Sequence, residues 1–282
     1  MLTSDMMHNM WPNGDAKVHG LIDGITAAAP TVFPKYGLDN DLVIAHAMAQ
    51  FSHECGAGSA MVENINYSAS RACAVWPSRF GNEASVYAKI GSGPGDPDFR
   101  IKLMDNVYGN RMGNRPGTHD GSTFIGRGLS QVTGRESYEK LGAMVGLDLV
   151  NNPDLVTSPA NAFECGVADF VLCGCLPFAR ADDVQGVTKH LNGGFIGLSE
   201  RMAWLARWKT ALGNQSPAPR STTWLQNALN KLGADPVLIA DGSFGPLTAA
   251  ALAAFQRAQG LDADGRVDPE TFAAIDAALA AL

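Results

Sequence analysis

The 282-residue sequence lacks a basic face. It has 21 Lys and Arg against 28 Asp and Glu, and acidic residues are in excess both before and after residue 219. Proteins bind nucleic acids and anionic membranes through clustered positive charge. The sequence therefore predicts no nucleic-acid partner and no anionic membrane surface as a partner.

Long apolar runs are also missing. No window approaches the ~18 uninterrupted apolar residues of a membrane span, and the first twenty residues show no cationic start followed by an apolar core. Such a start is the mark of a secretory signal. We expect no membrane insertion, and we expect the chain to stay in the compartment where it is made.

The five cysteines do not follow the spacings of a zinc site. Three of them, Cys165, Cys173 and Cys175, lie close together, but paired Cys-x2–4-Cys and His-x3–5-His patterns are absent. The Walker pattern of phosphate-binding loops is absent as well. We expect reduced thiols packed in helices, with no metal and no cofactor.

One segment of the chain has the composition of a linker. Residues 213–223, "GNQSPAPRSTT", contain two prolines and no large apolar side chain. We expect a main domain at 1–212, a linker at 213–223 and a small module at 224–282.

Helical periodicity dominates the main domain. Ile44, Met48 and Phe51 recur at helical spacing after a possible cap at Asp41, and a second helix is expected to start at Ser158-Pro159. Alternating strand patterns are scarce, and "ENINYS" (63–68) is the one candidate for a short strand. The sequence predicts a mainly α domain.

The small module contains an internal near-repeat. "DGSFGPLTAAALAAFQ" from Asp241 is echoed by "DGRVDPETFAAIDAAL" from Asp264. Each unit has an Asp-Gly turn, a Pro at the first helical position and an apolar helix. Together with a leading helix at 224–232, the repeat predicts a three-helix bundle, with Phe272, Ile275, Leu279 and Leu282 on the inner side of the last helix.

Two glutamates flank a glycine-rich connector. Glu54 continues the apolar stripe of the helix that contains Phe51, where a carboxyl is costly to ionise, whereas Glu63 lies among polar residues. Gly56 and Gly58 let the chain turn back between them. One protonated and one ionised carboxyl is the arrangement that glycoside hydrolysis requires. On spacing alone, two independent capping or pairing roles remain an alternative.

Polar loops and one inward arginine accompany the pair. "YGNRMGN" (108–114) and "GRGLSQVTGRESY" (126–138) have the glycine, amide and hydroxyl content of loops that hydrogen-bond sugars. Arg201 shares a helical face with Leu205 and Trp208, so it should point inward. A buried guanidinium needs a carboxylate, and we expect one of the two glutamates.

Six motifs in order resemble one enzyme family. "AQFSHECG…ENINYSA", "WPSRF", "YGNRMGN", "GRGLSQVTGRESY", "LNGG" and "ERMAWLARW" are similar to glycoside hydrolases of family nineteen, in their endolysin branch, over residues 36–212. The resemblance implies a two-lobed lysozyme-like helical domain. The segment after residue 223 resembles a peptidoglycan-binding domain, which is an independent match.

The resemblance implies roles for individual residues and an inverting, metal-free cleavage of β-1,4 bonds in peptidoglycan. It makes Glu54 the general acid, Glu63 the general base and Thr133 the residue that holds the attacking water. We expect a monomer that waits in the cytoplasm of a bacterial host until it reaches the wall. The substrate-binding residues implied or expected are Gln131, Asn192, Arg201 and Tyr67.

Three alternatives remain beside this reading. The same fold could act on chitin, or the whole chain could bind wall polymer without cutting it. Cys55, near His46 and His53, could also serve a peptidase that cuts the peptide stems. His53 is adjacent in sequence and His46 is more than two helical turns away, so neither is well placed to activate Cys55.

Overall fold

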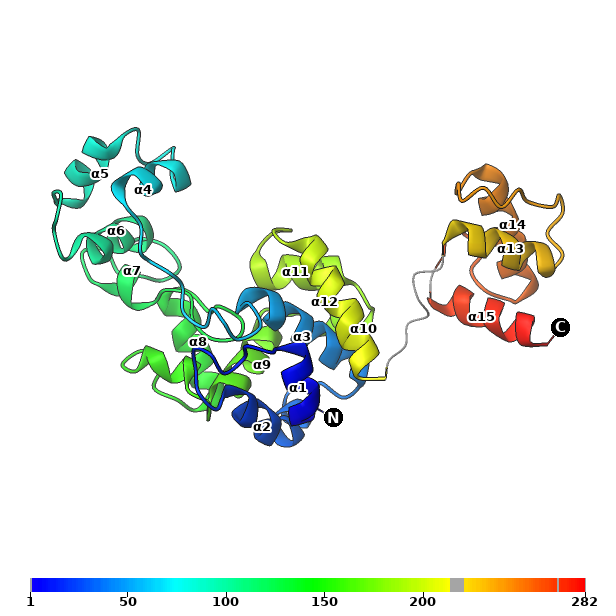
Figure 1. Cartoon of the computed structure of the whole chain (residues 1–282), viewed down its shortest axis with the longest axis horizontal. Coiled ribbons are helices and arrows are strands. Elements are labelled where there is room, and N and C mark those ends of the chain that lie inside the picture. The colour runs from blue at the N-terminus through cyan, green and yellow to red at the C-terminus, as the bar shows by residue number, and fades with distance from the viewer. Residues whose placement is uncertain (1, 214–220, 268, 282) are drawn as a thin grey trace. The chain divides into compact units, whose positions relative to one another are not determined.

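The structure is a computed structural model that describes residues 2–213, 221–267 and 269–281. The chain divides into two compact units, residues 1–214 and 215–282 (Figure 1). The linker expected at 213–223 falls mostly on residues outside the described ranges. Each unit is therefore described by itself.

The larger unit is built from helices arranged in two lobes. The small lobe contains α4–α7, which lie apart from the remaining helices (Figure 1). The mainly α class predicted from the sequence is confirmed. In order, the helices are α1 (Ser4–Met10), α2 (Leu21–Lys35), α3 (Asp41–Glu54), α4 (Ala69–Val75), α5 (Glu83–Ile90), α6 (Phe99–Tyr108), α7 (Asp120–Thr123), α8 (Arg135–Val145), the 3-10 helix η1 (Pro153–Thr157), α9 (Ala162–Leu172), α10 (Leu176–Arg180), α11 (Val184–Asn192) and α12 (Leu198–Ala211).

Helix α3 is the centre of the large lobe. Residues 43–52 are all buried, and the helix packs against α9, α10, α11 and α12. The indole N–H groups of Trp11 and Trp208 both donate to Ser52 Oγ at 2.8 Å, so one buried hydroxyl joins three segments. Asn40, not the expected Asp41, caps the helix, because its side chain accepts from the Val43 amide.

Two other local expectations are wrong. A helix does not start at Ser158-Pro159: the hydroxyl of Ser158 donates to the Leu155 carbonyl at the end of η1, and α9 begins later, at Ala162. The segment 63–68 is not a strand. Among the described residues the only bridges are isolated pairs, Val62 with Arg127 and Arg127 with Val132.

The small lobe has its own apolar core. Loops rather than long helices connect its elements, and it joins the large lobe near residues 62–68 and 125–127. Its buried side chains come from α4, α5 and α6, from the loop between α4 and α5 and from the segment that returns to the large lobe: Ala69, Ala72, Phe80, Val86, Leu103, Met104, Val107 and Ile125.

The smaller unit is a three-helix bundle, as predicted. It contains α13 (Thr222–Lys231), α14 (Pro246–Ala258) and α15 (Pro269–Ala280) around a core that includes Leu225, Leu252 and Ile275. Leu282, expected on the inner side of α15, lies outside the described residues. None of the described helices of the chain is long and apolar enough to cross a membrane.

The sequence repeat of the bundle corresponds to a repeated hydrogen-bond pattern. Buried Gln226 on α13 donates to Asp241 Oδ1 and Thr248 Oγ1, and it accepts from the Gly242 amide. Gln256 on α14 makes the equivalent bonds to Asp264, Thr271 and Gly265. Each helix therefore supplies the amide that holds the turn leading into the next helix.

Candidate active site

Glu54 lies at the C-terminal end of α3 in a charged environment. Arg201 Nη2 donates to its Oε1 at 2.6 Å, and Asn192 Nδ2 lies 3.4 Å from the same oxygen. The Glu54 side chain is 13% exposed. The apolar surroundings expected for Glu54 are therefore wrong, whereas the inward orientation of Arg201 and its pairing with a glutamate are confirmed.

Three helices hold Arg201 in place. Its side chain is buried, its Nε donates to the Ile196 carbonyl at 3.2 Å, and its Nη1 bonds to Gln50 Oε1 on α3. Gln50 in turn donates to Thr188 on α11 at 3.2 Å. Because every contact comes from a packed helix or the turn before α12, the guanidinium fixes the position of Glu54 Oε1.

Glu63 lies on an extended segment and has only neutral partners. Its amide donates to the Gly126 carbonyl at 2.8 Å, its Oε2 accepts from the Gly126 amide at 3.1 Å, and Tyr108 OH lies 3.4 Å from its Oε1. No described Lys or Arg approaches this carboxylate within 4 Å. The expected polar environment is confirmed, and Tyr67 is part of it as expected, whereas Asn64 and Asn66 bond to each other.

Gln131 and Thr133 meet Glu63 around Gly126. A Cβ added at Gly126 would lie 3.0 Å from Gln131 Oε1, 3.3 Å from Thr133 Oγ1 and 3.5 Å from Glu63 Cβ. Thr133 Oγ1 donates to the Gln131 carbonyl at 2.8 Å, which leaves its lone pairs free to accept. The structure thus brings three of the predicted site residues together, and Gly126 gives them the room to meet.

The predicted glycine turn between the glutamates is confirmed. Gly56, Ala57 and Gly58 all have positive φ, and a Cβ at Gly58 would lie 2.6 Å from the Gly14 carbonyl oxygen. After this turn, the Ala60 carbonyl accepts from Gln131 Nε2 at 3.2 Å. The side chain of Gln131 therefore ties the segment that leaves Glu54 to the loop that surrounds Glu63.

Tyr67 belongs to the same region as Glu63. Burial raises the pKa of its hydroxyl, and the nearby charge of Glu63 raises this pKa further. Its ring lies 4.9 Å from that of Trp76 in the small lobe. Asn192, in contrast, is on the side of Glu54, so the predicted substrate-binding residues are divided between the two glutamates.

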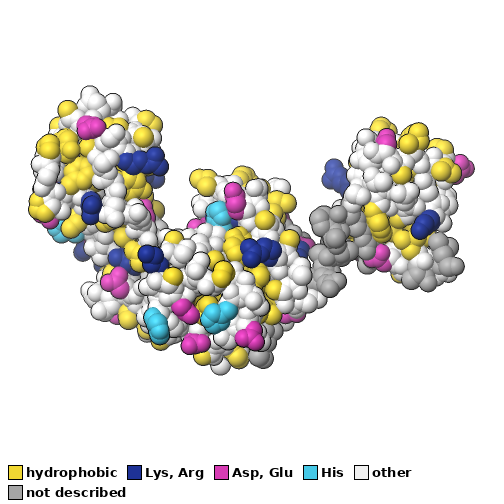
Figure 2. Space-filling model, in the orientation of Figure 1, with side chains coloured by type: hydrophobic (Ala, Val, Ile, Leu, Met, Phe, Trp, Pro, Cys, Tyr) yellow, Lys and Arg dark blue, Asp and Glu magenta, His cyan; other side chains and the backbone are white. Residues whose placement is uncertain are grey.

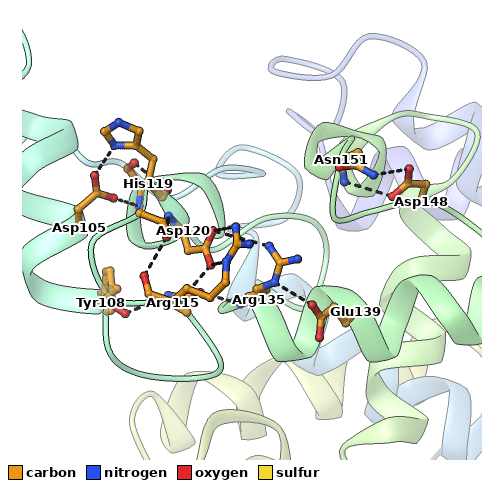
Figure 3. Close-up of polar contacts among 12 residues, drawn as sticks. Asp105, Tyr108, Arg115, His119, Asp120, Arg135, Glu139, Asp148 and Asn151 are labelled. Carbon is orange, nitrogen blue, oxygen red and sulfur yellow. Dashed lines mark hydrogen bonds and ion pairs between the residues drawn. The ribbon is translucent and has the colours of Figure 1, made fainter.

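The polar side chains of the two loops mostly bind the protein itself. Figure 3 shows Asp120 held by Arg115, whose Nε and Nη2 lie 2.9 and 3.0 Å from its two oxygens, and the hydrogen bond from Arg115 lowers the Asp120 pKa to about 2. Asn114 donates to the Tyr108 carbonyl, and Arg127 pairs with Asp154. Asn114 and Arg127, which belong to the loops 108–114 and 126–138, are therefore engaged within the protein, as are Arg115 and Asp120 between the loops. Sugar binding by these loops stays a prediction.

Sequence reasoning missed three groups near the glutamates. Tyr108 and the amide of Gly126 contact Glu63, and Asp169 on α9 interacts electrostatically with Glu54. Burial raises the pKa of Asp169 to about 6, against the lowering effect of a hydrogen bond from Ser130. Tyr108 and Gly126 were within quoted motifs, but only the folded chain shows what they face.

The thiols do not support a peptidase. Cys55 is buried, its Sγ donates to the Phe51 carbonyl at 3.0 Å, and burial raises its pKa to about 12. A thiolate is the nucleophilic form, so this cysteine is unreactive near neutral pH. Within the part of the chain that the structure describes, no group of three or more His, Cys, Asp and Glu could hold a metal ion.

Comparisons with known proteins identify both units. The family described as chitinase class I, glycoside hydrolase family 19, matches residues 102–171, and a peptidoglycan-binding domain matches residues 220–275. A family 19 domain-containing protein of Haemophilus influenzae is 29% identical over 184 residues, which cover 64% of this chain and 85% of the relative. The larger unit is therefore similar to family 19 glycoside hydrolases. The smaller unit is the peptidoglycan-binding domain.

Other relatives of the family 19 domain are chitinases by name. An acidic endochitinase of Solanum lycopersicum is 52% identical over 46 residues, which cover 16% of this chain and 19% of the relative. A solved structure of chitinase C from Streptomyces griseus is 17% identical with a TM-score of 0.49, covering 75% of this chain and 76% of that one. The matched segment 102–171 contains Gln131 and Thr133 but neither glutamate. The catalytic roles therefore stay predictions.

Proposed function

We propose that this protein is an endolysin-type enzyme that hydrolyses β-1,4 glycosidic bonds of bacterial peptidoglycan. The observation that carries the proposal is the union, in one chain, of a family 19 glycoside hydrolase domain with a peptidoglycan-binding domain. An enzyme for an insoluble polymer benefits from a tether, because binding raises the effective concentration of substrate at the active site.

Glu54 acts as the general acid in this proposal. Arg201 and Asn192 both bond to Oε1, and Oε2 has no hydrogen-bond partner among the described residues. The proton is therefore carried on Oε2, the free oxygen, from which it passes to the glycosidic oxygen as the bond to the leaving sugar breaks. Asp169 places a second acidic group nearby, and its pKa is raised by its own burial and further by the charge of Glu54.

Glu63 acts as the general base. A water molecule donates one hydrogen to the carboxylate of Glu63 and the other to Thr133 Oγ1, whose own proton is committed to the Gln131 carbonyl. The water oxygen then attacks the anomeric carbon from the face opposite the leaving group, with inversion. This single displacement requires the two carboxyl groups to stand roughly 6.5–9.5 Å apart when substrate is bound.

Product analysis on purified sacculi tests the proposal. We expect mass spectrometry to show glycan fragments with new reducing ends. We also expect NMR to show that the product first released has the inverted anomeric configuration. New free amines without new reducing ends would overturn it, because they mark peptide cleavage. The control is Arg207→Gln, a change at an exposed residue of α12 that should leave the product pattern unchanged.

Chitin hydrolysis is the second candidate. The relatives named as endochitinases favour it, whereas the peptidoglycan-binding domain does not. Parallel assays on sacculi and on N-acetylglucosamine oligomers distinguish the two. We expect the larger kcat/KM on sacculus-derived strands, and a clear preference for the oligomers would favour the chitinase.

A further inference from the structure

A pocket in the small lobe has no role in the mechanism above. Its volume is about 420 Å³, and it lies where the extended segment after Glu63 meets α5 and the start of α6. Three of its lining residues, Tyr67, Tyr87 and Phe99, are aromatic, and the rings of Tyr87 and Phe99 lie 5.6 Å apart. Its lining includes Tyr67, Tyr87, Gly93, Asp96, Phe99 and Arg100.

Arg100 is the cation that this pocket leaves available. Its side chain is exposed and makes no ion pair or hydrogen bond with any described residue. The acidic neighbour, Asp96, is already engaged by Lys102 Nζ at 2.7 Å and by Ser92 Oγ at 2.8 Å. The hydrogen bond from Lys102 lowers the pKa of Asp96 to about 2, so Asp96 stays ionised with its charge compensated.

The lobe around the pocket differs in charge from the rest of the chain. Residues 65–125 contain seven Lys and Arg against five Asp and Glu, whereas the chain as a whole has 21 against 28. Lys and Arg side chains are visible on this lobe in Figure 2. An uncompensated guanidinium on a weakly cationic lobe attracts carboxylates, which Arg binds in bidentate fashion.

The pocket is within reach of the catalytic region. Tyr67 lines it and also interacts electrostatically with Glu63, four residues earlier. Four residues of extended chain span at most about 14 Å. A peptide of similar length attached to a sugar at Glu63 could therefore extend into the pocket.

We propose that this pocket binds the peptide stem of peptidoglycan, with a stem carboxylate on Arg100 and the apolar part of the stem against the aromatic rings. The inference rests on the proposed function and specifies which part of the substrate the small lobe recognises. Chitin carries no carboxylate, so the pocket would give the enzyme a preference for peptide-bearing strands. The shared chemistry is a carboxylate, which a peptide-free strand also offers on its lactyl group.

Assays of Arg100→Gln and wild type on three substrates distinguish a stem carboxylate from a lactyl carboxylate as the ligand of Arg100. The substrates are strands with intact stems, strands stripped of stems by an amidase and therefore carrying free lactyl carboxylates, and neutral N-acetylglucosamine oligomers. We expect kcat/KM on stem-bearing strands to fall about fivefold to tenfold through KM, as for loss of one charge-assisted contact. On the other two substrates we expect less than a twofold change.

Each other outcome overturns the assignment. An equal loss on stripped strands would identify the lactyl carboxylate as the ligand, and an equal loss on neutral oligomers would show that Arg100 serves the glycan or the fold. No loss on any substrate would show that the pocket is not used. Arg207→Gln, the same charge change on an exposed residue of α12 outside the pocket, is the matched control. Failure of wild type to cut sacculi would instead refute the proposed function.

Discussion

The two glutamates are held by different kinds of structure. Glu54 is at the end of a buried helix, and a guanidinium fixed by α3, α11 and the turn before α12 bonds to it. Glu63 is on an extended segment, where a backbone amide and a tyrosine hydroxyl contact it. Packed helices thus position one carboxyl by charge, and loops position the other by neutral donors. The comparison indicates that the two sides respond differently to substitution.

The largest expected effect is that of Glu54→Gln on the helix side. The amide keeps the shape of the carboxyl but has no proton to give, so kcat should fall about 10³-fold or more on natural strands. An activated dinitrophenyl glycoside needs no protonation of its leaving group, and there the deficit should shrink. Steady-state kinetics on both substrates measure this, with thermal unfolding as a check on folding. Wild-type rates on natural strands would remove Glu54 from the acid role.

On the loop side, Glu63→Gln should cost about 10²–10³-fold in kcat. The deficit should be the same on natural and activated substrates, because water must be deprotonated in both. This contrast is the sharpest test of the comparison. If the activated substrate rescued Glu63→Gln and not Glu54→Gln, the two roles would have to be exchanged.

The substitution Thr133→Val tests how the loop side holds water. Loss of the hydroxyl should lower kcat about tenfold with little change in KM, because one hydrogen bond to the attacking water is lost. Thr133→Ser keeps the hydroxyl and should stay within about twofold of wild type. Equal losses for the two variants would indicate that the methyl group matters, not the hydroxyl.

The substitution Asp169→Asn tests how much the buried Asp169 carboxyl, on the Glu54 side of the site, lowers the unfolding free energy. The folded-state pKa of Asp169 is raised to about 6, so its proton is bound more tightly in the folded chain, and the unfolding free energy should fall as pH rises from about 4 to about 6. The variant lacks this loss, so its unfolding free energy relative to that of wild type should rise by about 2–3 kcal/mol between pH 4 and pH 7. Denaturant titrations across this range measure it, with exposed Asp23→Asn as control. Parallel pH profiles of wild type and Asp169→Asn would contradict the assignment.

The sequence predicted the helical scaffold better than the contacts of the site. The apolar spacing around Phe51 places α3 correctly, because burial dominates there, and the glycines after Glu54 predict the turn that follows. The start of α9 was missed because Ser158 ends one turn of 3-10 helix instead of capping the next helix. The 3-10 turn and the cap compete for the same serine, and local patterns do not decide between them.

The electrostatics of the site depend on contacts between distant residues. Arg201 is 147 positions from Glu54, and its inward face predicted a carboxylate partner without saying which glutamate. The apolar environment was assigned to Glu54 from its own helix alone, which carries no information about α12. Asp169 was missed for the same reason, since its carboxyl is buried among residues from other segments.

The repeated glutamine hydrogen bonds of the smaller unit have a consequence for engineering. Gln226 holds the turn that leads from α13 into α14, and Gln256 holds the turn that leads from α14 into α15, so both glutamines join segments that are neighbours along the chain. A domain held together by such hydrogen bonds folds through contacts of short sequence separation. Such a block should be transferable to another enzyme if the junction is made before Ser221, and in principle it could be lengthened by inserting one more helix that brings its own glutamine.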